Sequence, residues 1–143
     1  VLAGHHGVQH HVHARQRRSP AAHARIVTEA MQNPHASALS HPKGRILNRR
    51  PENALDLDAV FEVALETGLA LEINGLPDRL DLSHQHAAEA LAAGVDLVLN
   101  SDSHSTGGLA SIEYSVATAR RAATPRERVV NARSLSEIGA RAT

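Results

Sequence analysis

The hydrophobic residues of the chain follow two alternating patterns. Short, mostly apolar runs predict buried strands over residues 36–39, 69–73 and 95–99, and residues 8–12, with valine at both ends, give a further predicted strand. Apolar residues at helical spacing predict helices over residues 20–32, 57–67, 84–93, 111–122 and 134–141. Strands that alternate with helices of this length are typical of βαβ units, so we expect an α/β fold with a parallel sheet.

Residues that favour helix ends support three of these helices. Ser19, Asp56 and Ser83 precede helical segments, and each has a short side-chain oxygen that can accept a hydrogen bond from the first helical turn. Gly68 and Gly94 follow helical segments, where glycine commonly ends a helix because it adopts the left-handed conformation without strain.

Length and composition narrow the classes of protein. The 143 residues are enough for one domain, and without cysteine the chain can form neither disulfides nor thiolate metal sites. Fifteen basic and fifteen acidic residues cancel, so only local clusters, such as Lys43, Arg45, Arg49 and Arg50, can attract phosphate. No apolar run reaches the roughly 20 residues of a membrane span, and no signal peptide is visible, so we expect a cytoplasmic protein with no membrane partner.

Polar side chains stand where the predicted strands end. Right-handed crossovers bring the carboxyl ends of parallel strands to one rim of a sheet, which is where sites on α/β scaffolds form. The polar residues at these ends are His13, His41, Glu72, Asn74, Asp102 and His104.

Asp102 and His104 give the strongest chemical signal, because they lie in the segment 100–105 that directly follows the apolar run 95–99. Imidazoles with carboxylates and no thiol suit Mn²⁺, Zn²⁺ or Fe²⁺, with Mg²⁺ as a further candidate, rather than Ca²⁺. Such ions lower the pKa of bound water and hold phosphate oxygens, so this residue set favours phosphoester hydrolysis with both residues as catalytic metal ligands. The alternative is a solvated loop in which Asp102 only caps a turn.

Three other residues have a functional and a structural interpretation. His41 lies in the sequence His-Pro-Lys-Gly, which fixes the backbone of a metal ligand or forms an ordinary turn. Glu72, with Asn74 after it, supports the metal ligands in a buried polar network, or it is a strand-edge carboxylate paired with an arginine. Arg45 binds a substrate phosphate with its planar fork, or it belongs to a solvated basic loop.

Several segments, in order along nearly the whole chain, resemble the PHP (polymerase and histidinol phosphatase) domain, most closely the one at the carboxyl end of bacterial family X DNA polymerases. These segments are residues 39–47 (LSHPKGRIL), 71–75 (LEING), 77–82 (PDRLDL), 99–105 (LNSDSHS), 112–114, 119–121 and 130–135.

The resemblance implies a distorted (β/α)7 TIM-like barrel with a trinuclear metal centre. It places the last Asp-x-His pair of that centre on Asp102 and His104, the His-Pro ligand on His41, and a further ligand on His13; His11 inherits no such role. The family's other five ligands precede the matching region, and the chain begins at Val1 rather than at a methionine. We therefore expect residues 1–143 to be the carboxyl-terminal portion of a PHP domain, with a partial barrel and little activity alone.

The resemblance implies a metal-dependent phosphoesterase that processes DNA 3′ ends, as a 3′-5′ exonuclease or 3′-phosphatase, within a family X polymerase-like protein. Its expected partners are a phosphoester substrate and an upstream polymerase domain, or a second copy through exposed strand edges. Three alternatives stay open. They are a histidinol-phosphatase-like phosphomonoesterase, a non-catalytic remnant of the domain, and an amidohydrolase-like enzyme, against which the single lysine, Lys43, argues.

Overall fold

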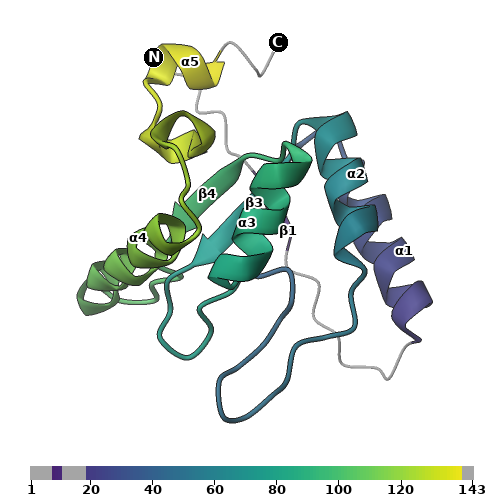
Figure 1. The fold of residues 1–143 in the computed structure, drawn as a ribbon, viewed down its shortest axis with the longest axis horizontal. Coiled ribbons are helices and arrows are strands. Elements are labelled where there is room, and N and C mark those ends of the chain that lie inside the picture. The colour runs from purple at the N-terminus through teal and green to yellow at the C-terminus, as the bar shows by residue number, and fades with distance from the viewer. Residues whose placement is uncertain (1–7, 11–18, 140–143) are drawn as a thin grey trace.

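The computed structural model describes residues 8–10 and 19–139 (Figure 1). The strands are β1 (Val8–His10), β2 (Ala36–Leu39), β3 (Ala70–Asn74) and β4 (Leu97–Asn100). The α-helices are α1 (Pro20–Met31), α2 (Leu57–Thr67), α3 (His84–Ala93), α4 (Ile112–Arg121) and α5 (Leu135–Gly139). Short 3-10 helices cover η1 (Thr106–Ser111), η2 (Arg126–Arg128) and η3 (Val130–Ala132). The predicted order of strands and helices is confirmed, although residues 11–12 and 140–141 of the predicted elements lie outside the described residues.

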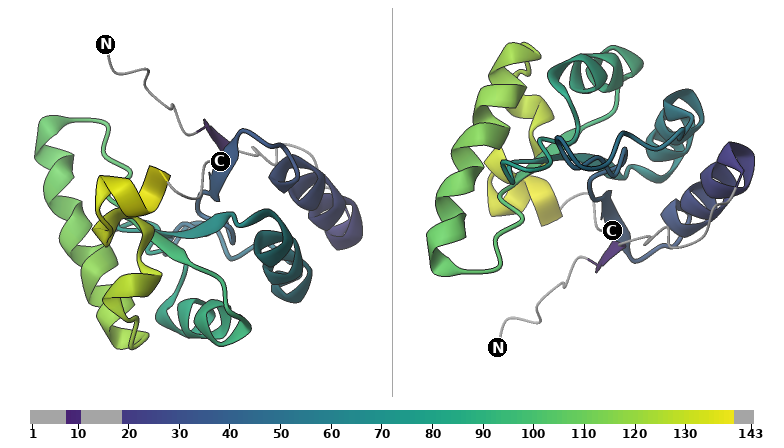
Figure 2. Two further views of the ribbon diagram at one scale, coloured as in Figure 1. Left: turned by 90° about the horizontal axis from the view of Figure 1, so that it is seen from above. Right: turned by 90° about the horizontal axis from the view of Figure 1, so that it is seen from below.

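The four strands form one parallel sheet in the order β1-β2-β3-β4, which confirms the predicted α/β fold. Each strand therefore lies beside the next strand in the sequence, and helices α1 to α4 follow one another around the outside of the sheet (Figure 2). Right-handed crossovers of consecutive parallel strands place the helices on one face in this way. Within the described residues the sheet does not close into a barrel, because β1 and β4 stand at its two edges.

The edge strand β4 gains a partial neighbour that the sequence patterns did not predict. Leu97 forms a parallel bridge with Val129. One turn later, the side-chain amide of Asn131 pairs with the backbone of Leu99: the N–H of Leu99 donates to Oδ1 at 3.1 Å, and Nδ2 donates to the carbonyl at 2.7 Å. The side chain of Asn131 thus pairs with backbone groups of the edge strand that a further strand would otherwise bind.

Strand β3 is the centre of the hydrophobic core, and all five of its residues are buried. A parallel strand covered on both faces has this pattern. Helix α2 packs Val60, Phe61 and Ala64 into the same core, and the fully buried residues of helix α3 are the small Ala87 and Ala90. Burying each large apolar side chain contributes about 1.5–3 kcal/mol.

The predicted helix caps form as expected. Ser19 accepts a hydrogen bond from the N–H of Ala22, and Asp56 and Ser83 cap α2 and α3 in the same way. Gly68 and Gly94 end their helices with φ of 70° and 94°. In the part of the chain that the structure describes, no helix has both the length and the apolar content to cross a membrane.

An ion-pair cluster attaches the carboxyl-terminal segment to the end of the sheet at which the strands begin. The buried carboxylate of Asp96 accepts from Nε of Arg128 at 2.7 Å and from Nη2 of Arg133 at 2.8 Å. A buried carboxylate needs such partners, because burial of an unpaired charge is costly. The cluster lies at the amino ends of the strands and leaves the opposite rim to the candidate site.

Candidate functional site

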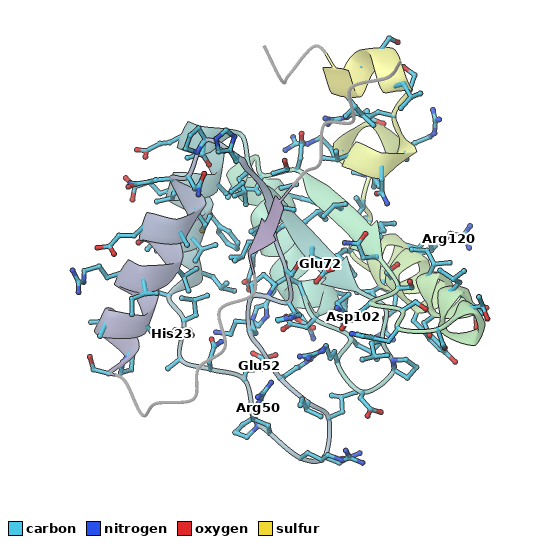
Figure 3. All side chains as sticks on the ribbon, turned by 180° about the vertical axis from the view of Figure 1, so that it is seen from behind. His23, Arg50, Glu52, Glu72, Asp102 and Arg120 are labelled. Carbon is cyan, nitrogen blue, oxygen red and sulfur yellow. The ribbon has the colours of Figure 1, made fainter. Side chains whose placement is uncertain are left out.

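The carboxyl ends of β2, β3 and β4 lie at one end of the sheet, and the long loops that follow β2 and β3 extend from it (Figure 1). His41, Glu72 and Asp102 come from these three successive strands or directly follow them. Figure 3 shows Glu72 within the sheet and Asp102 beside it at this rim. The arrangement matches the rim that parallel strands predict.

Glu72 joins the ends of the three strands. Its buried carboxylate accepts hydrogen bonds from the backbone N–H of His41 at 2.7 Å, from Nδ2 of Asn100 at 2.9 Å and from Nδ2 of Asn74 at 3.3 Å. All of these donors are amides, so Glu72 belongs to a buried polar network rather than to an arginine pair in the described part of the chain. Asn100 is the member of this network that the sequence analysis did not single out.

The Glu72 network predicts the effect of replacing one oxygen of the Glu72 carboxylate. Glu72→Gln puts an NH2 group in place of one carboxylate oxygen, and this group faces an amide donor to which it cannot bond. We expect the free energy of unfolding to fall by about 1–3 kcal/mol, the cost of a buried donor left without its acceptor. Urea unfolding measures this change, and Glu66→Gln on the exposed side of α2 is the matched control. Equal stabilities of the two variants would contradict the role of the network.

His41 has a strained backbone that this network holds in place. Its φ of 32° lies in the left-handed region, which few residues with a side chain adopt. The bond to Glu72 and the bond from the N–H of Gly44 to the His41 carbonyl at 2.9 Å fix both of its peptide groups. Such strain persists only where the surroundings enforce it, and it concentrates at functional sites.

A cavity of about 200 Å³ lies beside His41. Two of its lining residues carry buried polar atoms without a hydrogen-bond partner, Oγ of Ser40 and Nη1 of Arg79. Arg50 and His23, from the long loop and from helix α1, also line it. Most of its polar lining can therefore interact with an anion that enters.

Asp102 also has a left-handed backbone, with φ of 52°. Its carboxylate Oδ2 lies 3.2 Å from Nε of Arg79. The Asp102 carbonyl oxygen lies 2.9 Å from Nδ1 of His104, and because a carbonyl can only accept, Nδ1 must carry the proton. In the neutral ring this leaves the lone pair of Nε2 available, so the exposed His104 is in the tautomer that allows metal ligation through Nε2.

Arg79 is a candidate site residue that sequence reasoning missed. Its Nε and Nη1 are buried and make no aligned hydrogen bond in the described part of the chain, although Nε is close enough to Asp102 for an ion pair. It lines the same cavity as His41 and forms an ion pair with Asp102. Its position in the resembling segment 77–82 was the one available signal.

Arg45, predicted to contact a substrate phosphate, is bonded within the protein. Its Nε donates to the carbonyl of Arg79 at 2.8 Å, Nη1 pairs with Glu52 at 3.1 Å, and Nη2 donates to the carbonyl of Leu80. The guanidinium group of Arg45 therefore joins the loop after β2 to the loop after β3 by hydrogen bonds. The predicted phosphate contact would require these bonds to break.

The predicted metal ligands are not assembled into a site among the described residues. His13, together with His11, lies outside them. Within residues 19–139, no three His, Asp or Glu side chains gather in a way that could hold a metal ion. His41, Asp102 and His104 share one rim and offer donors that suit Mn²⁺, Zn²⁺ or Fe²⁺. Their fit to a metal centre is therefore partial, and metal binding stays a prediction.

Asp81 is a second residue that the sequence patterns did not single out. It is fully buried, its Oδ1 accepts from the N–H of Lys43 at 3.3 Å, and its Oδ2 has no hydrogen-bond partner. Burial raises the pKa of Asp81 to about 6, and the nearby charge of Arg45 opposes the rise. A carboxyl that resists ionisation thus supports the turn that carries Lys43, two residues after His41.

Comparison with known proteins gives one informative relative. No protein-family model matches the chain. The chain is 40% identical over 111 residues to the DNA polymerase/3′-5′ exonuclease PolX of Bacillus subtilis (strain 168). The match covers 78% of this chain but 20% of the relative, so the chain spans about a fifth of the length of the curated relative that it matches. The chain is therefore similar to a segment of a polymerase/exonuclease, and this similarity supports a PolX-related segment.

Proposed function

We propose that the chain is part of a metal-dependent phosphoesterase that processes DNA 3′ ends, as a 3′-5′ exonuclease or 3′-phosphatase. The observation that carries the proposal is the pair of strained residues, His41 and Asp102, at one rim, with Arg79 in the cavity beside His41 and in an ion pair with Asp102. The similarity to a polymerase/3′-5′ exonuclease supports the same conclusion. In this proposal the parallel sheet is a portion of a PHP-type barrel within a family X polymerase-like protein.

Each residue has a role in the proposed reaction. His41, Asp102, His104 through Nε2, and His13 would hold divalent metal ions, which supply water activation and neutralise phosphate charge when bound. Asp102 would also orient the attacking water. Glu72 keeps His41 in its strained conformation through the 2.7 Å bond. Arg79, whose Nε and Nη1 are buried without an aligned hydrogen bond to a described residue, would bind a substrate phosphate, and this assignment replaces the one to Arg45.

One observation favours a second candidate, a non-catalytic remnant of such a domain. No three potential ligands gather among the described residues, and the Asp102 carboxylate is paired with Arg79 instead. A remnant would retain the buried Glu72 network for stability and would lack metal-dependent hydrolysis.

The test compares three substrates in the presence of Mn²⁺. They are an oligonucleotide with a 3′-hydroxyl, the same oligonucleotide with a 3′-phosphate, and histidinol phosphate as a small phosphomonoester. Both the 143-residue chain and the full reading frame that encodes it are assayed. We expect release of a nucleotide or of phosphate from the DNA substrates. Turnover of histidinol phosphate alone would favour the phosphomonoesterase, and no turnover of any substrate by either protein would favour the remnant.

A further inference from the structure

The loop after β2 is a firmly anchored, arginine-bearing structure at the candidate site. We call residues 44–53 the arginine loop. Ile46 and Arg50 exchange backbone hydrogen bonds of 2.9 and 2.8 Å across its tip. The N–H of Leu47 donates to the carbonyl of Asp78 at 2.6 Å, and the N–H of Asn53 donates to that of Lys43 at 2.8 Å. These bonds fix the loop to the rim, so its exposed side chains are presented from a defined backbone.

Two of its three arginines have no neutralising partner in the described structure. Glu52 pairs with Arg45. Among the described residues, the Arg50 side chain makes one hydrogen bond, from Nε to the carbonyl of Gly44 at 2.8 Å, and the Arg49 side chain makes neither a hydrogen bond nor an ion pair. Both residues are exposed, so the loop carries two uncompensated positive charges on a chain with no net charge.

These charges lie beside the candidate site and continue away from it. Arg50 lines the 200 Å³ cavity together with His41 and Arg79. Arg50 and Arg49 also line an open hollow of about 400 Å³ that is formed by residues 45–52 alone. Figure 3 shows Arg50 and Glu52 on this loop below the sheet. Positively charged side chains therefore extend from the cavity to the outer side of the loop.

We propose that the arginine loop binds the sugar–phosphate backbone of single-stranded DNA whose end enters the cavity at His41. The proposal rests on the proposed function. Arginine forks match phosphate oxygens in geometry and charge. A free phosphomonoester in the cavity could reach Arg50 but not also the outer hollow, whereas a polymer offers successive phosphates to both arginines.

The size and composition of the surface define the ligand further. A cavity of about 200 Å³ is smaller than the roughly 300 Å³ at which pockets for drug-sized ligands begin, so it suits a strand terminus rather than a base pair. The chain has two aromatic residues, of which Phe61 is buried and Tyr114 lies on helix α4. The arginine loop itself has none, so binding here is to the backbone, independent of sequence and strongly salt-dependent.

The test measures binding of a fluorescein-labelled oligothymidylate by anisotropy over a range of salt concentrations, in the presence of a chelator. The variant R49Q/R50Q is compared with R120Q/R121Q, which removes the same charge from exposed positions on α4; Figure 3 shows Arg120 away from the arginine loop. For R49Q/R50Q we expect about tenfold weaker binding at low salt, and a slope of log K against log salt that is smaller by about 1.4, or about 0.7 for each lost phosphate contact. For R120Q/R121Q we expect neither change.

A third variant separates charge from structure. R50K keeps the charge and loses the bond to the Gly44 carbonyl, so we expect it to retain the salt slope of the original protein. Equal losses in R49Q/R50Q and R120Q/R121Q, or a slope for R50K that falls by the roughly 0.7 expected for one lost phosphate contact, would overturn the proposal. Because binding is measured without metal, the proposed hydrolysis can fail while this contact holds, and hydrolysis can occur in a protein whose slope does not change.

Discussion

Replacing Asp102 with alanine is expected to reduce phosphoesterase activity by at least about 100-fold, since even partners of metal ligands contribute about 10- to 100-fold. Two physical reasons support this size. Asp102 is the only carboxylate among the four proposed metal ligands, and its Oδ2 lies 3.2 Å from Nε of the half-buried Arg79, whose charge it balances. Asp102→Asn keeps the shape of the side chain and removes the charge, so we expect a loss of the same order.

The matched control is Asp78→Ala. Asp78 lies in the adjacent loop and is exposed, and its described hydrogen bond uses the backbone carbonyl rather than the carboxylate. We expect this variant to keep its activity. Initial rates with the DNA 3′-end substrate at saturating Mn²⁺ measure both variants. If Asp102→Ala retains the rate of Asp78→Ala, Asp102 is not part of the reacting site.

The second large effect is on stability and concerns Asp81. Burial raises the pKa of this carboxyl from 3.8 to about 6, so the folded protein holds the proton more tightly than the unfolded chain does. Its contribution to the free energy of unfolding is highest below about pH 4, declines as the pH rises towards 6, and stays low above pH 6. A shift of about two pKa units corresponds to about 3 kcal/mol.

Asp81→Asn removes this pH dependence because the amide has no charge to bury. Its oxygen can still accept from the N–H of Lys43, as Oδ1 does at 3.3 Å. We expect the stability of the variant, relative to the original protein, to increase by about 3 kcal/mol between pH 4 and pH 7.5. Urea unfolding at several pH values measures the difference in stability between the two proteins. The titration of the histidines contributes equally to both proteins and so cancels in this difference. Parallel stability curves would contradict the raised pKa, and Asp78→Asn, at an exposed position, should give such curves.

Local patterns predicted the elements of this fold because each has a local cause. The apolar run before Asn74 is a strand that is buried on both faces, and the caps at Ser19 and Ser83 form as their side chains require. The common rim of His41 and Asp102 follows from parallel strands alone. These features depend on neighbours in the sequence or on a general rule of topology.

The features that were missed depend on contacts between residues distant in the sequence. Asn100 bonds to Glu72 across 28 residues, and Asn131 pairs with Leu99 across 32. Asp81 stands in a polar loop that looks exposed, and only the folded chain buries it. The predicted role of Arg45 has the same limit, because the sequence does not show that backbone carbonyls of the next loop occupy its fork.

The most direct test of the central claim is reversible metal dependence of DNA 3′-end hydrolysis. The protein is treated with a chelator, assayed, and assayed again after addition of Mn²⁺, Zn²⁺, Fe²⁺ or Mg²⁺ in separate samples. We predict that the chelator abolishes release of nucleotide or phosphate from the 3′ end, that at least one of these ions restores it, and that no ion restores it in Asp102→Ala. Hydrolysis that continues in the chelator, or that the ions restore equally in Asp102→Ala, would contradict the account.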